Sequence, residues 1–95
     1  MDNNKIQELK KYSDPVEVAK IAKRYDLEVF PSTRKDKKYM IKLDDNKVVH
    51  FGQMLYKDYT LTKDDKKRDA FRARNHKWAS ANKTTAAWLS YHLLW

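Results

Sequence analysis

The residues with the clearest capacity for chemistry are the arginines of the second half of the chain. Three of the five, Arg68, Arg72 and Arg74, lie within seven residues of one another. Residues four apart share one face of a helix, so Arg68 and Arg72 are expected on the same side. The planar guanidinium group suits phosphate oxygens better than the lysine ammonium does. The cluster therefore predicts contact with the phosphates of DNA or RNA, and a merely solvated basic face is the alternative.

A second group of cations precedes this helix, in the polar stretch from Pro31 to Lys37. If that loop lies beside the helix, the two groups form one continuous basic surface. Phe71 and Trp78 lie near the arginines and could stack on bases, although packing in the core is the favoured role for both. The predicted nucleic-acid-binding residues are Arg34, Lys35, Lys37, Lys63, Lys67, Arg68, Arg72, Arg74 and Lys77.

The net charge of +8 arises entirely after Phe30. Residues 1–30 carry six basic and six acidic side chains, residues 31–56 carry six and three, and residues 57–95 carry nine and four. A basic region attracts polyanions such as DNA, RNA or an acidic protein surface. The distribution predicts a neutral front part and a basic back part with different roles. Solubility alone is the competing explanation for the excess charge.

Histidine and aspartate are the residue types of this chain that could serve a catalytic or metal site, but their spacing matches no such site. The three histidines, His50, His76 and His92, have no metal-ligand spacing and the chain has no cysteine, so no metal site is expected. We interpret them as hydrogen-bonded structural residues. Asp58, beside Lys57, is the aspartate that would suit a metal-dependent nuclease. A turn, helix capping or helix pairing explains the others, which are Asp44, Asp45, Asp64, Asp65 and Asp69. We expect neither an enzyme nor a cofactor.

The first 26 residues are expected to form two helices. Ile6 and Leu9 are spaced for one face of a short helix, and Ser13 or Asp14 can cap a second helix that starts at Pro15. Proline suits the first turn because its missing N–H has no partner there.

The middle of the chain alternates apolar and polar residues, as strands do. Strands are expected at 27–30, 38–43 and 48–51, with a turn at 44–47. In the central strand Tyr39, Ile41 and Leu43 should share one face, and Lys38, Met40 and Lys42 the other. Lys38 is also expected in the basic surface patch with Arg34, Lys35 and Lys37. Gly52, the single glycine, predicts a bulge, a turn or a close backbone approach. A phosphate-binding glycine loop is excluded because it needs a second glycine.

Helices are expected to complete the chain. Thr62 can cap a helix that runs to about Ala79, and Thr84 or Thr85 can cap a final helix through Trp95. The final helix is apolar almost all round, so it is either buried or packed on a partner. Its candidate partner-binding residues are Trp88, Tyr91 and Trp95.

These elements indicate an α+β fold, with a small three-stranded antiparallel sheet or hairpin packed against C-terminal helices and preceded by a helical pair. The expected parts are an N-terminal helical segment, 1–26, and a basic α+β domain, 27–95. The start of the chain lacks the apolar core of a signal peptide, and the longest apolar run is too short to span a bilayer. We therefore expect a protein that is not secreted and has no membrane partner.

The stretch from Pro31 to Trp95 contains a series of motifs, namely Lys37-Lys38-Tyr39-Met40, His50-Phe51-Gly52, Tyr56-Lys57-Asp58-Tyr59-Thr60, Lys63-Asp64, Arg68, Phe71, Arg72, Arg74, His76, Trp78, Trp88-Leu89-Ser90 and Leu94-Trp95. With these motifs it resembles a small uncharacterised protein family of large eukaryotic DNA viruses and phages. At Thr62 that family usually has a histidine, so shared histidine chemistry is not expected there. The resemblance implies a viral origin, location in the virion or the interior of the infected cell, and no defined activity.

Two functions from different classes follow from the sequence. The first is a small basic viral nucleic-acid-binding protein that contacts phosphates through the arginine-rich helix and the basic hairpin loop. The second is a virion structural or assembly protein whose apolar C-terminal helix docks on a capsid protein or on a second copy of the chain, which would make an oligomer.

Overall fold

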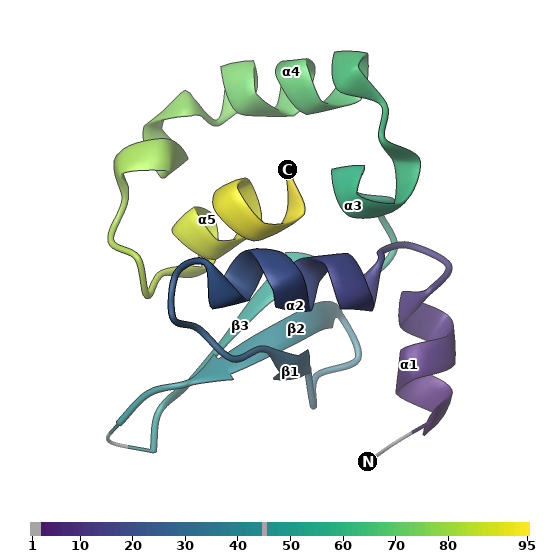
Figure 1. Cartoon of the computed structure of the whole chain (residues 1–95), viewed down its shortest axis with the longest axis vertical. Helices are drawn as coiled ribbons and strands as arrows, with labels where there is room; N and C mark the ends of the chain where they lie inside the picture. The colour runs from purple at the N-terminus through teal and green to yellow at the C-terminus, as the bar shows by residue number, and fades with distance from the viewer. Residues whose placement is uncertain (1–2, 45) are drawn as a thin grey trace.

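A three-stranded antiparallel sheet lies at the centre of the fold in the computed structural model, which describes residues 3–44 and 46–95 (Figure 1). The predicted α+β class and the three-stranded sheet are confirmed. Tyr39 lies opposite Phe51, and Phe30 lies opposite Met40. In spatial order the strands are β1 (Phe30–Pro31), β2 (Lys37–Lys42) and β3 (Val48–Gln53).

Helices precede and follow the sheet. Asp14 caps the second helix by accepting a hydrogen bond from the Glu17 N–H at 3.2 Å, and Pro15 occupies the first turn as predicted. Thr85 likewise caps the C-terminal helix, through the Trp88 N–H. In chain order the helices are α1 (Asn3–Leu9), α2 (Pro15–Lys23), α3 (Tyr59–Thr62), α4 (Asp65–Arg74), the 3₁₀-helix η1 (His76–Ser80), α5 (Ala86–Leu89) and its π-helical continuation η2 (Ser90–Leu94).

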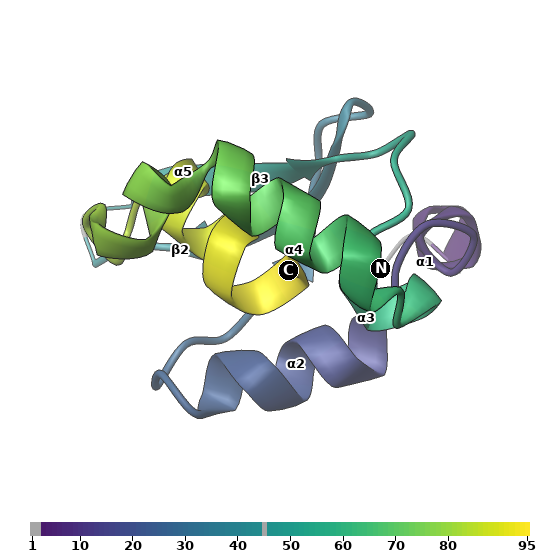
Figure 2. The ribbon, with the colours of Figure 1, turned by 90° about the horizontal axis from the view of Figure 1, so that it is seen from above.

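One hydrophobic core joins the two ends of the chain to the sheet. The C-terminal helix lies between α2 and the strands, with α5 against β3 and η2 against both α2 and β3 (Figure 2). Tyr25 of the front part meets Trp88 edge to face, with ring centroids 4.9 Å apart. The buried apolar residues of the core are Leu9, Val18, Ala22, Tyr39, Ile41, Phe51, Met54, Trp88, Leu89, Leu93 and Leu94.

The prediction of one continuous helix from Thr62 to about Ala79 is wrong, because this stretch contains the separate helices α4 and η1. Lys63 has a left-handed backbone (φ 53°), which ends α3, and Asp64 rather than Thr62 caps α4. Asn75 then departs from helical geometry and separates α4 from η1. The two aspartates Asp58 and Asp64 are both good caps, and each one starts a separate helix.

The expectation that Lys38 belongs to a basic surface patch is also wrong, because this residue is buried. Four successive residues of β2, from Lys38 to Ile41, are buried, so both faces of this strand are covered. The turn that follows is closed by the Leu43 N–H, which donates to the Lys47 carbonyl at 2.7 Å. Asp45, the second aspartate expected in this turn, lies outside the described residues.

Gly52 fulfils the expectation of a special backbone position within β3. Its φ is +81°, a conformation that residues with a Cβ rarely adopt. A Cβ atom there would lie 2.8 Å from Cδ1 of Leu94 and 3.3 Å from Cβ of Lys38. Only glycine allows the strand, the buried lysine and the C-terminal helix to approach this closely.

Candidate functional site

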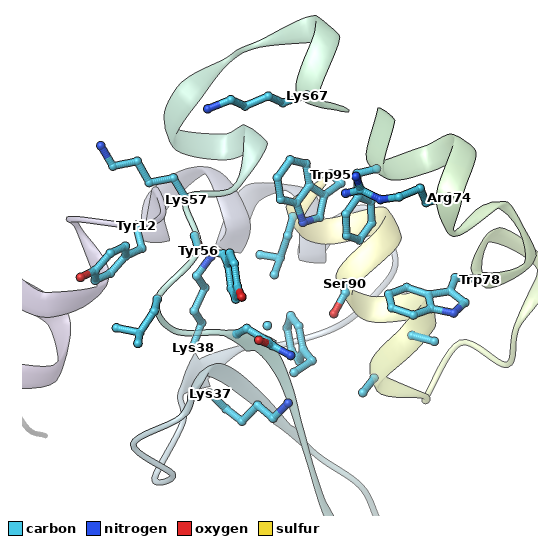
Figure 3. A pocket seen from close by; sticks show the side chains of 18 of the residues that line it. Tyr12, Lys37, Lys38, Tyr56, Lys57, Lys67, Arg74, Trp78, Ser90 and Trp95 are labelled. Atoms are coloured by element: carbon cyan, nitrogen blue, oxygen red, sulfur yellow. The ribbon is translucent and has the colours of Figure 1, made fainter. Parts of the chain in front are cut away.

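A hollow of about 920 Å³ lies between α4 and the rest of the molecule. Helix α4 and η1 cover it, the end of β3 and residues 55–57 line it from below, and the C-terminal helix forms a further wall. Figure 3 shows Lys67 and Arg74 above the hollow, Lys37 below it, and Tyr56 and Ser90 on opposite sides. Its size lies at the upper end of the range for small-molecule sites.

The residues that line this hollow include lysines and an arginine but no aspartate or glutamate. Four of its cations, Lys37, Lys57, Lys67 and Arg74, make no ion pair within residues 3–44 and 46–95. Four like charges around one hollow favour the binding of an anion there. We refer to these four residues as the groove cations.

Aromatic side chains line the same hollow. Phe71 of α4 stacks on Trp95 with centroids 4.5 Å apart and planes 9° from parallel, and Trp78 meets Phe71 edge-on at 5.8 Å. Tyr56 is 65% exposed and Trp78 is 36% exposed. The expectation that Trp78 belongs to the core is therefore wrong, whereas Phe71 is half-buried over the hollow.

The arginine cluster of the second half of the chain is divided in the fold. Arg74 lines the hollow, but Arg68 lies over the Tyr59 ring at 4.8 Å and contacts Asp65 and Asp69 at 3.7 and 3.4 Å. Arg72 donates to the Trp95 carbonyl at 2.8 Å, so it holds α4 to the C-terminal helix. Arg68 and Arg72 therefore make intramolecular contacts in the folded chain.

The hairpin loop contributes one groove cation, Lys37. Arg34 is instead paired with Asp36 at 2.8 Å, and this hydrogen bond lowers the pKa of the Asp36 carboxyl. Lys35 is exposed and does not line the hollow. The structure thus places Lys37 on one side of the hollow and the helix residues Lys67 and Arg74 on the opposite side (Figure 3).

Two further predicted cations lie elsewhere. Lys63 is 3.9 Å from the Glu17 carboxylate, and Lys77 is exposed on η1 outside the hollow. Lys57 lines the hollow but was not predicted as part of the site. Its place in the box Tyr56-Lys57-Asp58 could have suggested it, since aromatic and basic residues are adjacent there.

Lys38 and Asp58 form a buried ion pair beneath the hollow. Their side chains are 2% and 0% exposed, and the Lys38 Nζ lies 3.0 Å from Oδ2 of Asp58. Lys38 also donates to the Tyr56 carbonyl. Burial lowers the pKa of Lys38, and the nearby carboxylate opposes that change. This pair was not anticipated, because an alternating strand pattern places Lys38 on an exposed face.

The other oxygen of Asp58 continues the network. It accepts hydrogen bonds from the N–H and the hydroxyl of Thr60, whose hydroxyl lies 3.2 Å from that of Ser13. Tyr39 donates to Ser13 at 2.7 Å, and burial raises the pKa of the Tyr39 phenol. The network connects the turn between α1 and α2 with the central strand and α3.

Asp58 therefore has a structural explanation that competes with the nuclease interpretation. It caps α3, pairs with Lys38 and is fully buried. No group of three or more His, Cys, Asp or Glu side chains that could hold a metal ion occurs in the described part of the chain.

Each histidine has a hydrogen-bond partner, as expected of structural histidines. The Nδ1 atom of His50 lies 2.7 Å from the Ser32 hydroxyl, and that of His76 lies 3.2 Å from the Ala73 carbonyl. His92 contacts the Ala79 carbonyl through Nε2 at 3.0 Å. The three lie on different elements, β3, η1 and η2.

The C-terminal helix buries most of its apolar residues in the core. Trp88 is only 8% exposed, so the structure places this candidate docking residue inside the molecule. Tyr91 and Trp95 are partly exposed. None of the helices formed by the described residues is both long and apolar enough to cross a bilayer.

Comparison with known proteins gives a family but no activity. Neither the curated proteins nor the solved structures match this chain. A family model described as a family of unknown function, DUF5754, matches residues 27–75. The matched stretch covers the sheet, the Lys38–Asp58 pair, helix α4 and all four groove cations, and the wall formed by the C-terminal helix lies beyond it. Because the match spans more than half of the sequence, the chain belongs to the DUF5754 family.

Proposed function

We propose that this protein binds nucleic acid through the groove cations. The observation that carries the proposal is the lining of the hollow, which has four cations without an ion pair to any described residue and no aspartate or glutamate. Neutralisation of phosphates by lysine and arginine releases counterions from nucleic acid, which supplies most of the binding free energy of basic proteins. Phosphate contacts through Arg68 and Arg72 are not part of the proposal.

The structure gives less support to the virion-assembly alternative. That function requires an apolar docking face on the C-terminal helix, and Trp88, Leu89 and Leu93 are buried in the core of the single chain. The viral origin inferred from the resemblance remains a prediction, since the DUF5754 match carries no function.

The proposal predicts binding that weakens steeply with salt and depends on the groove cations. The affinity for a labelled oligonucleotide would be measured by fluorescence anisotropy between about 50 and about 200 mM salt. In the variant K37Q/K57Q/K67Q/R74Q we expect weaker binding. Its log–log salt slope should be smaller by about 0.7–0.9 for each phosphate that the variant no longer neutralises.

The matched control is K10Q/K11Q/K20Q/K23Q, which removes the same charge from exposed positions on the front part of the chain. This control should keep most of the affinity, and urea unfolding would confirm that both variants fold. Equal loss in the two variants, or no binding by the unaltered protein, would contradict a site at the groove. Equally tight binding to poly-glutamate would point to a general polyanion site.

A further inference from the structure

The aromatic residues of the hollow specify the kind of nucleic acid, given the proposed function. We propose that the groove binds a single strand and that bases stack on Tyr56 and Trp78. Both rings line the hollow and are open to solvent, at 65% and 36% exposure, while Phe71 and Trp95 stack on each other behind them. Aromatic faces combined with a basic groove are the usual means of holding single-stranded nucleic acid without reading its sequence.

The positions of charge and aromatic rings favour a single strand over a duplex. In a duplex the bases are stacked on one another, so exposed tyrosine and tryptophan rings would meet only sugar and phosphate. A single strand exposes its base faces and can turn them inward while its phosphates meet cations. The groove cations lie on both sides of the aromatic lining, with Lys37 on β2 and Lys67 and Arg74 on α4 (Figure 3).

The hollow also offers polar groups for the edges of unpaired bases. Ser90 lies on the wall formed by η2, and its hydroxyl has no hydrogen-bond partner within the part of the chain that is described. The side-chain amide of Gln53, at the end of β3, is likewise exposed and without such a partner. A hydroxyl and an amide can each donate and accept, so they tolerate more than one base.

The experiment compares single strands with a duplex of the same length. Anisotropy would be measured with labelled oligo(dT), oligo(U) and a mixed-sequence duplex, with thymidine monophosphate as a competitor. We expect tighter binding of the single strands than of the duplex. Tyr56→Ala should weaken single-strand binding by about fivefold to a hundredfold and leave duplex binding unchanged, since loss of one stacked base has an effect of that order.

Matched variants separate stacking from other effects. Tyr56→Phe keeps an aromatic ring and should bind like the unaltered protein. Val16→Ala removes an apolar side chain that is 67% exposed and lies outside the hollow, and it should have little effect. Trp78→Ala should act in the same direction as Tyr56→Ala. The substitutions at Tyr56 leave the core undisturbed, because Tyr56 packs on the surface.

The outcomes distinguish this inference from the proposed function. Salt-sensitive binding that is equal for single strands and duplex, and that Tyr56→Ala and Trp78→Ala leave unchanged, would overturn single-strand stacking while nucleic-acid binding stands. Competition by thymidine monophosphate at the same concentration as oligo(dT) would also overturn it, in favour of a nucleotide site. If neither single strands nor duplex bind, the proposed function fails as well.

Discussion

At the scale of single residues, the least expected feature is a charged pair in the interior. Transfer of a lysine and a carboxylate out of water is costly, and only close pairing and further hydrogen bonds compensate for it. Lys38 has Asp58 and the Tyr56 carbonyl as acceptors, and Asp58 has Lys38 and two groups of Thr60 as donors. Among the described residues, no buried side-chain polar atom lacks a partner. The pair therefore fixes the segment carrying Tyr56 against β2.

Breaking this pair from either side should destabilise the fold. We predict that Lys38→Met and Asp58→Asn each lower the free energy of unfolding by about 3–5 kcal/mol, because each leaves a buried charge without its partner. Asparagine can still cap α3, so loss of the cap does not account for the effect. The double variant should lose clearly less than the two single losses combined. Urea unfolding at neutral pH measures all three, and additive losses would contradict a coupled pair.

At the scale of elements, α4 is a weakly anchored helix. It has no buried residue, and two contacts with Trp95 hold its C-terminal half: the stack of Phe71 and the hydrogen bond from Arg72. Elements with little buried apolar surface open locally at low free-energy cost. Helix α4 also covers the hollow, so its opening would widen the route by which a strand enters.

Weakening the anchor should release α4 and leave the sheet intact. In Phe71→Ala we predict faster amide hydrogen exchange in α4 and unchanged protection in β2 and β3, because the replaced ring contacts only Trp78 and Trp95 among the aromatic residues described. Hydrogen exchange followed by mass spectrometry or NMR would resolve the two regions. Uniformly faster exchange over both regions would instead show that α4 is part of the global unfolding unit.

Local signals in the sequence predicted where helices begin better than where they are interrupted. Asp14, Pro15 and Thr85 act within a few residues of the helices they start, so caps were recognisable. Asp58 and Asp64 each cap a helix, so the chain must end the first helix between them, and it does so at the left-handed Lys63. The periodicity of apolar residues gives no sign of such a break. Lys38 was misplaced for a related reason: its partner lies twenty residues away, and a strand pattern records only neighbours.

The candidate site was predicted in part. The distribution of charge placed the basic part after Phe30, and three of the predicted residues, Lys37, Lys67 and Arg74, line the same hollow; their binding of nucleic acid stays a prediction. Arg68 and Arg72 could not be separated from Arg74 in the sequence, because their intramolecular partners depend on where the chain folds back. The aromatic lining was likewise assigned mostly to the core.

At the scale of the whole molecule, the front part and the back part share one core. Leu9, Val18 and Ala22 are fully buried against the sheet and the C-terminal helix, and Ser13 belongs to the network of Asp58. A chain of this length buries a smaller fraction of its surface on folding than a larger protein does, so the loss of any part of its apolar core should lower its stability strongly.

The isolated stretch 27–95 should therefore fail to fold cooperatively. Its separation from residues 1–26 exposes the surface that α1 and α2 cover and leaves Thr60 without the Ser13 hydroxyl. We predict a broad urea transition and poorly dispersed amide resonances for this fragment, against a single sharp transition for the full chain. A fragment that unfolds as sharply as the full chain would show that 27–95 is an autonomous domain.

The three tryptophans occupy two different environments, so intrinsic tryptophan fluorescence can report on both folding and ligand binding. Trp88 lies in the core, whereas Trp78 and Trp95 line the hollow. Emission from the buried ring reports the folded state, and emission from the other two responds to whatever enters beside them. In the single-tryptophan variant W88F/W95F, Trp78 would report occupancy of the hollow without any attached dye, so ligands could be screened with unlabelled protein.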